Sequence, residues 1–185
     1  MPAPVIFLID MPLGYLAAAL CIGAYVWPRL GTMDRTQAHR AIATLHSFRF
    51  FGLVFLLPGF VGPNLPQEFA TAAAYGDFAT GVLAILALLA VRVRRVFWTL
   101  VWAFNLVGLA DLLIDTTLAV RLGLPSVAGQ LGASYAILML YVPALFWTHL
   151  AALWLLLRPA PALTRAARAP TPLASAEQPG MGRPA

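Results

Sequence analysis

The sequence predicts an all-α integral membrane bundle of five transmembrane helices, with the N-terminus outside and the C-terminus in the cytoplasm. Of its 185 residues, 61% are hydrophobic and only 10% are charged, whereas soluble domains are about 45–50% apolar and about 25% charged. Five apolar segments each provide the roughly 20 residues needed to cross a bilayer. They lack the strict apolar–polar alternation of barrel strands, so helices are expected.

The five expected spans are separated by turn-forming or arginine-containing stretches. They cover approximately residues 11–29, 41–62, 67–91, 97–120 and 134–157. Asp10 and Pro12 suit the cap and the first turn of the first helix. The third helix follows the turn-rich stretch GPNLP. In the fifth span, Pro143 has no N–H to offer the carbonyl of Met139, so the helix is expected to kink there.

Arginine placement predicts the orientation of the spans. All 12 basic residues are arginines, and nine of them follow the first, third and fifth spans: Arg29, Arg35, Arg40, Arg92, Arg94, Arg95, Arg158, Arg165 and Arg168. The connections on the opposite side contain only Arg121. Positive residues accumulate in cytoplasmic loops, which places the N-terminus outside. The same placement at span ends argues against a nucleic-acid partner, despite a net charge of +5.

Two further features limit the extent of the bundle and the kinds of site that it can contain. The Pro- and Ala-rich residues 159–185 have little apolar surface to bury, and they are predicted to form a disordered cytoplasmic tail. Cys21 is the single cysteine, which excludes an intramolecular disulfide and any paired-cysteine metal site. The bundle itself is therefore expected within residues 1–158, with the lipid bilayer as its main partner.

Polar side chains inside the predicted spans are the candidates for function. At about 1.5 Å per residue, Asp77 and Asp111 lie about 21 Å from the cytoplasmic ends of their helices. Arg49, Asn105 and His149 share a level at about 12 Å. Asp115 lies one turn from Asp111, and Asn105 is on the same side of that helix. These six residues are therefore expected to face the interior of the bundle and to form one site.

Two interpretations of this cluster remain open. The polar groups can form a hydrogen-bonded clasp between helices, since such contacts are common and individually modest. Alternatively, they can hold a proton or a cation, because ionisable residues within a membrane are functional candidates by default. Three carboxylates cannot all pair with one arginine. Either some are protonated, or a cation or a water-filled cavity neutralises them.

Other polar patterns suggest weaker alternatives. His46 and His149 are candidate axial ligands of haem b, although no haem-attachment motif accompanies them. Tyr75-Gly76-Asp77 is similar to part of the GxGD motif of intramembrane aspartyl proteases, but Ala74 stands where the first glycine is required. A second stripe, at helical spacing on the second span, is expected to attract lipid phosphates or an acidic ligand group, or to snorkel toward the headgroups. It consists of Arg35, His39, His46 and Arg49.

Four strings resemble a group of small bacterial multi-pass membrane proteins of uncharacterised function. They are LHSFRFFGLVFLLPG, AAYGDFATGVLAILAL, WAFNLVGLADLL and YVPALFWTHLAALWLLLR. The resemblance extends from the second span to the end of the fifth. It implies a bacterial inner-membrane location and a shared polar constellation, and it brings no catalytic residues.

Three functions follow as hypotheses. The first is binding or transport of a proton, cation or small ligand at Asp77, Asp111, Asp115, Asn105, Arg49 and His149. The second is a structural or accessory subunit of a membrane complex, in which a membrane-protein partner or a second copy of the chain is expected. The third is a haem b redox protein. No catalytic motif is present, so an enzyme is not the favoured class.

Overall fold

The computed structural model describes residues 1–158, and this part of the chain is helical, with no β-strand. The predicted tail, residues 159–185, lies outside the described residues. The elements are α1 (Ala3–Cys21), a π-helical turn η1 (Ile22–Val26), α2 (Trp27–Thr32), α3 (Arg35–Ser47), the 3-10 helix η2 (Phe48–Leu56), α4 (Gln67–Leu89), the 3-10 turn η3 (Ala90–Arg92), α5 (Arg94–Arg121), the 3-10 segment η4 (Leu124–Ser134), the π-helical turn η5 (Ile137–Tyr141) and α6 (Val142–Leu157).

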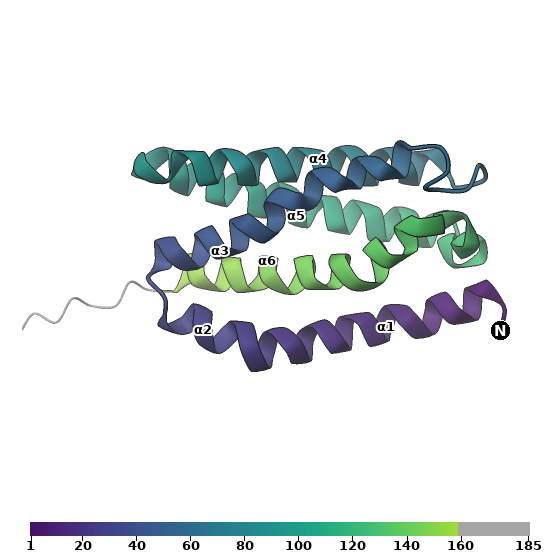
Figure 1. The fold of residues 1–185 in the computed structure, drawn as a ribbon, viewed down its shortest axis with the longest axis horizontal. Coiled ribbons are helices and arrows are strands. Elements are labelled where there is room, and N and C mark those ends of the chain that lie inside the picture. The colour runs from purple at the N-terminus through teal and green to yellow at the C-terminus, as the bar shows by residue number, and fades with distance from the viewer. Residues whose placement is uncertain (159–185) are drawn as a thin grey trace, which may run out of the picture.

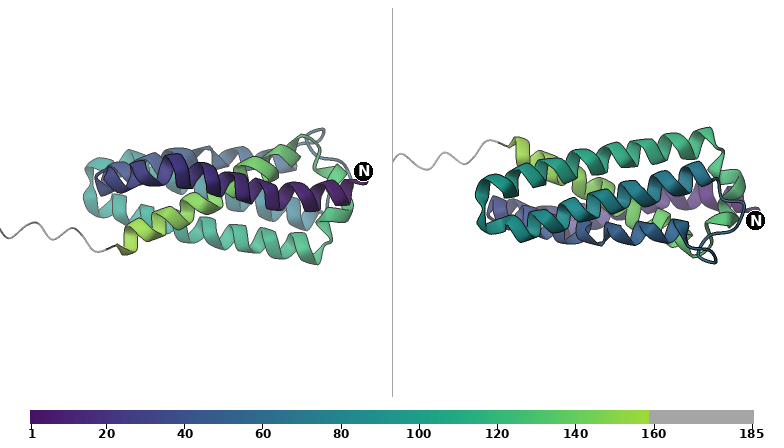
Figure 2. Two further views of the ribbon diagram at one scale, coloured as in Figure 1. Left: turned by 90° about the horizontal axis from the view of Figure 1, so that it is seen from below. Right: turned by 90° about the horizontal axis from the view of Figure 1, so that it is seen from above.

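The helices lie side by side along one long axis (Figure 1). The chain runs out along α1 and α2, returns along α3 and η2, and then reverses direction with each of α4, α5 and α6. α4 packs against α3, η2 and α5, and α6 packs against α1, α3 and α5. α1 lies at the edge of the bundle, where it contacts α6, η4 and η5 (Figure 2).

Among residues 1–158, four segments are long and apolar enough to cross a membrane: Ala3–Thr32, Gln67–Arg92, Arg94–Arg121 and Ile137–Leu157. They correspond to the first, third, fourth and fifth predicted spans. The bounds of the third and fourth agree with the prediction to within a few residues. An all-α fold with several membrane-type helices is therefore what the structure shows.

The first helix begins earlier than predicted. Pro2 is extended and α1 starts at Ala3, so Pro4 is the first-turn proline and Pro12 lies inside the helix. Asp10 is consequently not a cap. Its carboxylate accepts a hydrogen bond from the hydroxyl of Tyr135, at 2.7 Å, which ties α1 to the start of the last helical segment.

The second predicted span is not one α-helix. α3 starts at Arg35, capped by the side chain of Asp34, and continues as the 3-10 helix η2 only to Leu56. In a 3-10 helix residues three apart are eclipsed, so Arg49, Gly52 and Phe55 form one buried line. That line faces α4. The constant 3.6-residue period did not predict this 3-10 segment, although Arg49 was expected to face the interior and does so.

The last span is also interrupted. Residues before Pro143 adopt a π-helical turn, η5, instead of regular α-helix. The expected kink therefore takes the form of a π-helical turn, which commonly accompanies a break in the hydrogen-bond ladder. The span predicted to start at residue 134 is preceded by 3-10 segment η4, which includes Gly132 with a φ of 53°.

Two apolar clusters form the core, one toward each end of the bundle. One contains Phe55, Phe69 and Leu131 with their neighbours, and the other contains Phe97, Phe104 and Leu155 with theirs. Along α4 and α5 the buried polar residues lie between the two clusters. The polar site is therefore closed by apolar packing at both ends.

A close approach of α1 to the last helical segment, at Gly14, generates a prediction. A Cβ on Gly14 would overlap the carbonyl oxygen of Met139, whereas a Cβ on Gly23 would meet nothing within 4 Å. Gly14→Ala is expected to destabilise the protein by about 1–3 kcal/mol, through overpacking. Gly23→Ala is expected to be neutral or to stabilise by up to about 1 kcal/mol. Thermal unfolding of the purified protein in detergent, followed by circular dichroism, measures the difference, and equal effects would contradict the contact.

Candidate functional site

The buried guanidinium of Arg49 is the centre of the polar site. This side chain comes from η2 and is 0% exposed. Its Nε donates a hydrogen bond of 2.6 Å to Asp77 on α4, and its Nη2 donates to the carboxylate of Asp111 on α5. Its Nη1 lies 3.0 Å from Nε2 of His149 on α6. One side chain therefore joins η2 to three other helices.

The remaining contacts define the tautomer of His149. The amide nitrogen of Asn105 donates to the carbonyl of Val101, at 2.8 Å, which leaves its oxygen as the acceptor for Nδ1 of His149 at 2.9 Å. Nδ1 therefore carries the proton, and Nε2 is free to accept a hydrogen bond from Arg49. Asn105 and His149 thus orient the guanidinium, and both are 0% exposed.

Three glycines allow the helices to come this close, and the sequence analysis missed them. A Cβ on Gly52 would overlap the Asp77 carboxylate, and one on Gly76 would overlap that of Asp111. A Cβ on Gly108 would overlap His149 and would lie 2.7 Å from Nη1 of Arg49. The available signal was a glycine within one turn of a charged residue inside an apolar segment, as in Gly76-Asp77.

Asp115 differs from the other two carboxylates. It lies one turn beyond Asp111 on α5, and its Oδ1 is buried without a hydrogen-bond partner among the described residues. Arg49 already binds Asp77 and Asp111. The site therefore contains three carboxylates and one guanidinium, and Asp115 is the carboxylate that the guanidinium does not bind.

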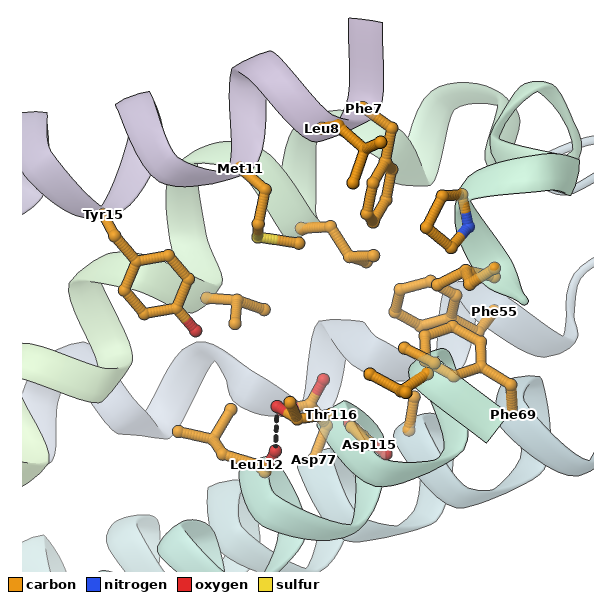
Figure 3. Close-up of a pocket in the computed structure, with 17 residues that line it drawn as sticks. Phe7, Leu8, Met11, Tyr15, Phe55, Phe69, Asp77, Leu112, Asp115 and Thr116 are labelled. Atoms are coloured by element: carbon orange, nitrogen blue, oxygen red, sulfur yellow. Dashed lines mark hydrogen bonds between the residues drawn. The ribbon is translucent and has the colours of Figure 1, made fainter. Parts of the chain in front are cut away.

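A cavity of about 370 Å³ adjoins the carboxylates of Asp77 and Asp115. Asp77, Asp115 and Thr116 lie along one side of it, and Phe7, Met11 and Tyr15 of α1 lie on the other (Figure 3). Most of the remaining lining is apolar, including Phe55 and Phe69. The cavity is thus an apolar chamber with carboxylates at one place in its wall, a composition typical of small-molecule sites.

The structure brings together all six residues that the sequence analysis selected. Arg49, Asp77, Asn105, Asp111 and His149 form one connected hydrogen-bond network. Asp115 is adjacent to that network and faces the cavity instead. Asp77, the aspartate of the partial GxGD motif, binds Arg49 together with Asp111.

The expectation that the arginine–histidine stripe faces lipid headgroups is wrong. His39, His46 and Arg49 are each 0% exposed, because α3 and η2 turn this stripe toward α4 and α6. Arg35 donates hydrogen bonds of 2.6 and 2.9 Å to the carbonyls of Leu155 and Leu156, at the end of α6. It therefore caps that helix, where a positive charge is favourable.

The histidine arrangement does not fit haem. The ring centroids of His46 and His149 are 4.0 Å apart, with planes inclined at 42°, so the two rings contact each other and leave no space for a porphyrin. Nε2 of His46 lies 3.1 Å from the hydroxyl of Thr148, and both ring nitrogens of His149 have partners. Within residues 1–158 no group of three or more His, Cys, Asp or Glu side chains is arranged to hold a metal ion.

Fold and site together define a class: an all-α protein with several membrane-type helices around a buried arginine–carboxylate network. More particularly, the chain belongs to the family described as a domain of unknown function, DUF8737, which matches residues 6–157. That match includes every residue of the polar site. No curated protein and no solved structure matches the chain.

The network predicts an asymmetric response to mutation. Arg49→Met leaves two buried carboxylates without their cation and is expected to destabilise the protein by about 3–5 kcal/mol. Neutralising the partners as well, in Arg49→Met/Asp77→Asn/Asp111→Asn, is expected to restore part of that loss. The control Arg40→Met removes an exposed arginine of α3 and is expected to change stability by no more than about 0.5 kcal/mol. Chemical or thermal unfolding measures all three, and a triple variant less stable than Arg49→Met would contradict the network.

Proposed function

We propose that this chain is a multi-pass protein of a bacterial inner membrane, and that its carboxylate cluster binds a proton or a small cationic ligand. The distribution of polarity supports a lipid environment. Leu113 and Leu140 are 67% and 72% exposed, while Arg49 is 0% exposed. Such an arrangement is unfavourable in water. In lipid it places apolar side chains against acyl chains and polar groups inside the bundle.

A fifth crossing is supported by the segment formed by α3 and η2. Its 13 α-helical and 9 3-10 residues extend about 37 Å, at about 1.5 and 2.0 Å per residue, and a hydrocarbon core is about 30 Å thick. The segment runs the length of the bundle beside α4 (Figure 1). Its polar residues His39, His46 and Arg49 are buried, so they do not face lipid.

The arginines support an N-terminus outside and a C-terminus in the cytoplasm. Arginines gather at one end of the bundle, where α2, η3 and α6 end and where α3 and α5 start. They are Arg29, Arg35, Arg92, Arg94, Arg95 and Arg158. Within residues 1–158, the opposite end has only Arg121. This asymmetry favours the arginine-rich end as the cytoplasmic one.

Reporter fusions test this topology. Green fluorescent protein at the C-terminus of the full chain is expected to fluoresce, and alkaline phosphatase there is expected to be inactive. Phosphatase inserted after Gly123, at the opposite end of the bundle, is expected to be active. If α3 and η2 do not cross, the two termini lie on the same side. A dark C-terminal fusion together with an external N-terminal tag would then refute five crossings.

The unpartnered oxygen of Asp115 is the main observation that supports the binding function. Arg49 compensates Asp77 and Asp111, but Asp115 has a buried oxygen with no partner among the described residues. A buried unpaired polar group is costly, and a charged one more so. A proton or a cation at Asp115 removes that cost. The absence of a gathered set of metal ligands in residues 1–158 favours a proton or an organic cation over a multivalent metal.

A second candidate is a structural or accessory subunit of a membrane complex. The contact of Arg49 with α4, α5 and α6 favours this role, because holding helices together is a sufficient function for such a network. In that case the network is complete without any ligand, and Asp115 has no separate role.

Neutralising Asp115 distinguishes the two candidates. If it binds a proton, ionisation adds an uncompensated negative charge to the bundle, so the unfolding temperature should fall as the pH rises from about 5 to about 9. If it binds a cation, sodium chloride should stabilise the protein more than N-methylglucamine chloride does. Asp115→Asn is expected to reduce whichever response is seen by at least about 3 °C.

Glu68→Gln is the matched control, since it neutralises an exposed carboxylate at the start of α4. It should leave both responses intact. If Asp115→Asn also leaves them intact, the proton and cation hypotheses fail and the structural role is preferred.

A further inference from the structure

We propose that the cavity beside Asp115 binds a lipophilic amine, with the apolar body of the ligand in the chamber and its ammonium group at the carboxylates. This inference rests on the proposed binding function and names its ligand class. The ammonium would contact Asp115 and the side of Asp77 that faces the cavity. Arg49 would remain bound to Asp77 and Asp111, so binding would not open the helix network.

The lining of the cavity fits a mostly apolar ligand. The chamber holds about 370 Å³ and is bordered by the aromatic rings of Phe7, Tyr15, Phe55 and Phe69. These rings come from α1, η2 and α4, on walls other than that of Asp115, which is on α5 (Figure 3). A volume of this size suits a small organic molecule with an aromatic or branched aliphatic body.

The charge of the site selects the polar group of the ligand. An anion would be repelled by the carboxylates that line the cavity. A neutral ligand without a donor would offer the Asp115 carboxylate no hydrogen bond and no compensating charge. An ammonium group supplies both a positive charge and several donors, and a charge-assisted hydrogen bond is the stronger kind. The rings that line the chamber can also face a cation favourably.

The position of the opening indicates a route from the lipid phase. Leu8 of α1 and Val120 of α5 line the cavity, yet they are 61% and 77% exposed. α1 packs on α6, η4 and η5, and it makes no extensive contact with α5. α6 runs obliquely, so that it lies away from the C-terminal half of α5 (Figure 2). The opening is therefore on the flank of the bundle, between α1 and α5, and a membrane-dissolved amphiphile can enter there.

A pair of probes that differ only in charge tests the inference. Phenylhexylamine is protonated at neutral pH, and phenylhexanol has the same apolar body with a neutral head. Binding to the full chain in lipid nanodiscs is measured by equilibrium dialysis, with empty nanodiscs as the blank. Saturable binding of the amine is expected, with an affinity at least about tenfold above that of the alcohol.

Two variants and one control locate the probe. Asp115→Asn should weaken amine binding at least about tenfold and leave alcohol binding nearly unchanged. Ala119→Phe places a ring in the chamber from α5, where Ala119 lines it, and should abolish binding of both probes. Glu68→Gln should change neither. Circular dichroism confirms that each variant is folded, and Ala119→Phe keeps the test decisive if Asp115→Asn does not fold.

The outcomes separate this inference from the function on which it rests. No saturable amine binding would overturn the inference. Equal affinities for amine and alcohol, or amine binding unaffected by Asp115→Asn, would also overturn it and would identify the chamber as a site for apolar chains. If Asp115→Asn still removes the pH or ion response of stability, the proposed proton or cation function survives that failure.

Discussion

The contact of the Arg49 guanidinium with Asp77 and Asp111 is the constraint on which the rest of the bundle depends. A guanidinium with no exposure is tolerable only where opposite charges and hydrogen-bond acceptors meet it. Meeting it requires η2, α4 and α5 to lie within the length of one side chain, which the absence of a Cβ at Gly52 and Gly76 permits. The 3-10 winding of η2 aligns Arg49 with Gly52, and both face α4.

The proposed lipid environment would explain how this network serves stability. Between helices surrounded by acyl chains there is no hydrophobic driving force, so close packing and polar contacts select the partners. The network meets that need with Arg49, Asp77, Asn105, Asp111 and His149. Asp115 is the one carboxylate of the cluster that Arg49 does not bind, and it borders the cavity. In the proposed function, stability and binding therefore belong to neighbouring residues, one helical turn apart.

The agreement between sequence and structure varies by element. α4 and α5 were predicted closely, because each is an uninterrupted apolar segment bounded by turn residues or arginines. α1 began earlier, since Pro4 and not Pro12 opens the helix. The second span was misassigned because a constant period of 3.6 residues was applied to a segment that changes to a 3-10 helix at Phe48. The arginine–histidine stripe was grouped correctly, but it was taken to face lipid headgroups, whereas His39, His46 and Arg49 are buried.

By itself, the sequence determined the apolar class of the chain, most of its long apolar helices, and which polar residues lie deep within them, because composition and helical rise are local properties. The pairing of those residues was decided only by the tertiary structure. Arg49 meets partners 28, 62 and 100 positions away, and no local pattern records such a distance. The contact between the rings of His46 and His149, which leaves no space for haem, and the chamber beside Asp115 arise in the same way, from how separate helices pack against one another.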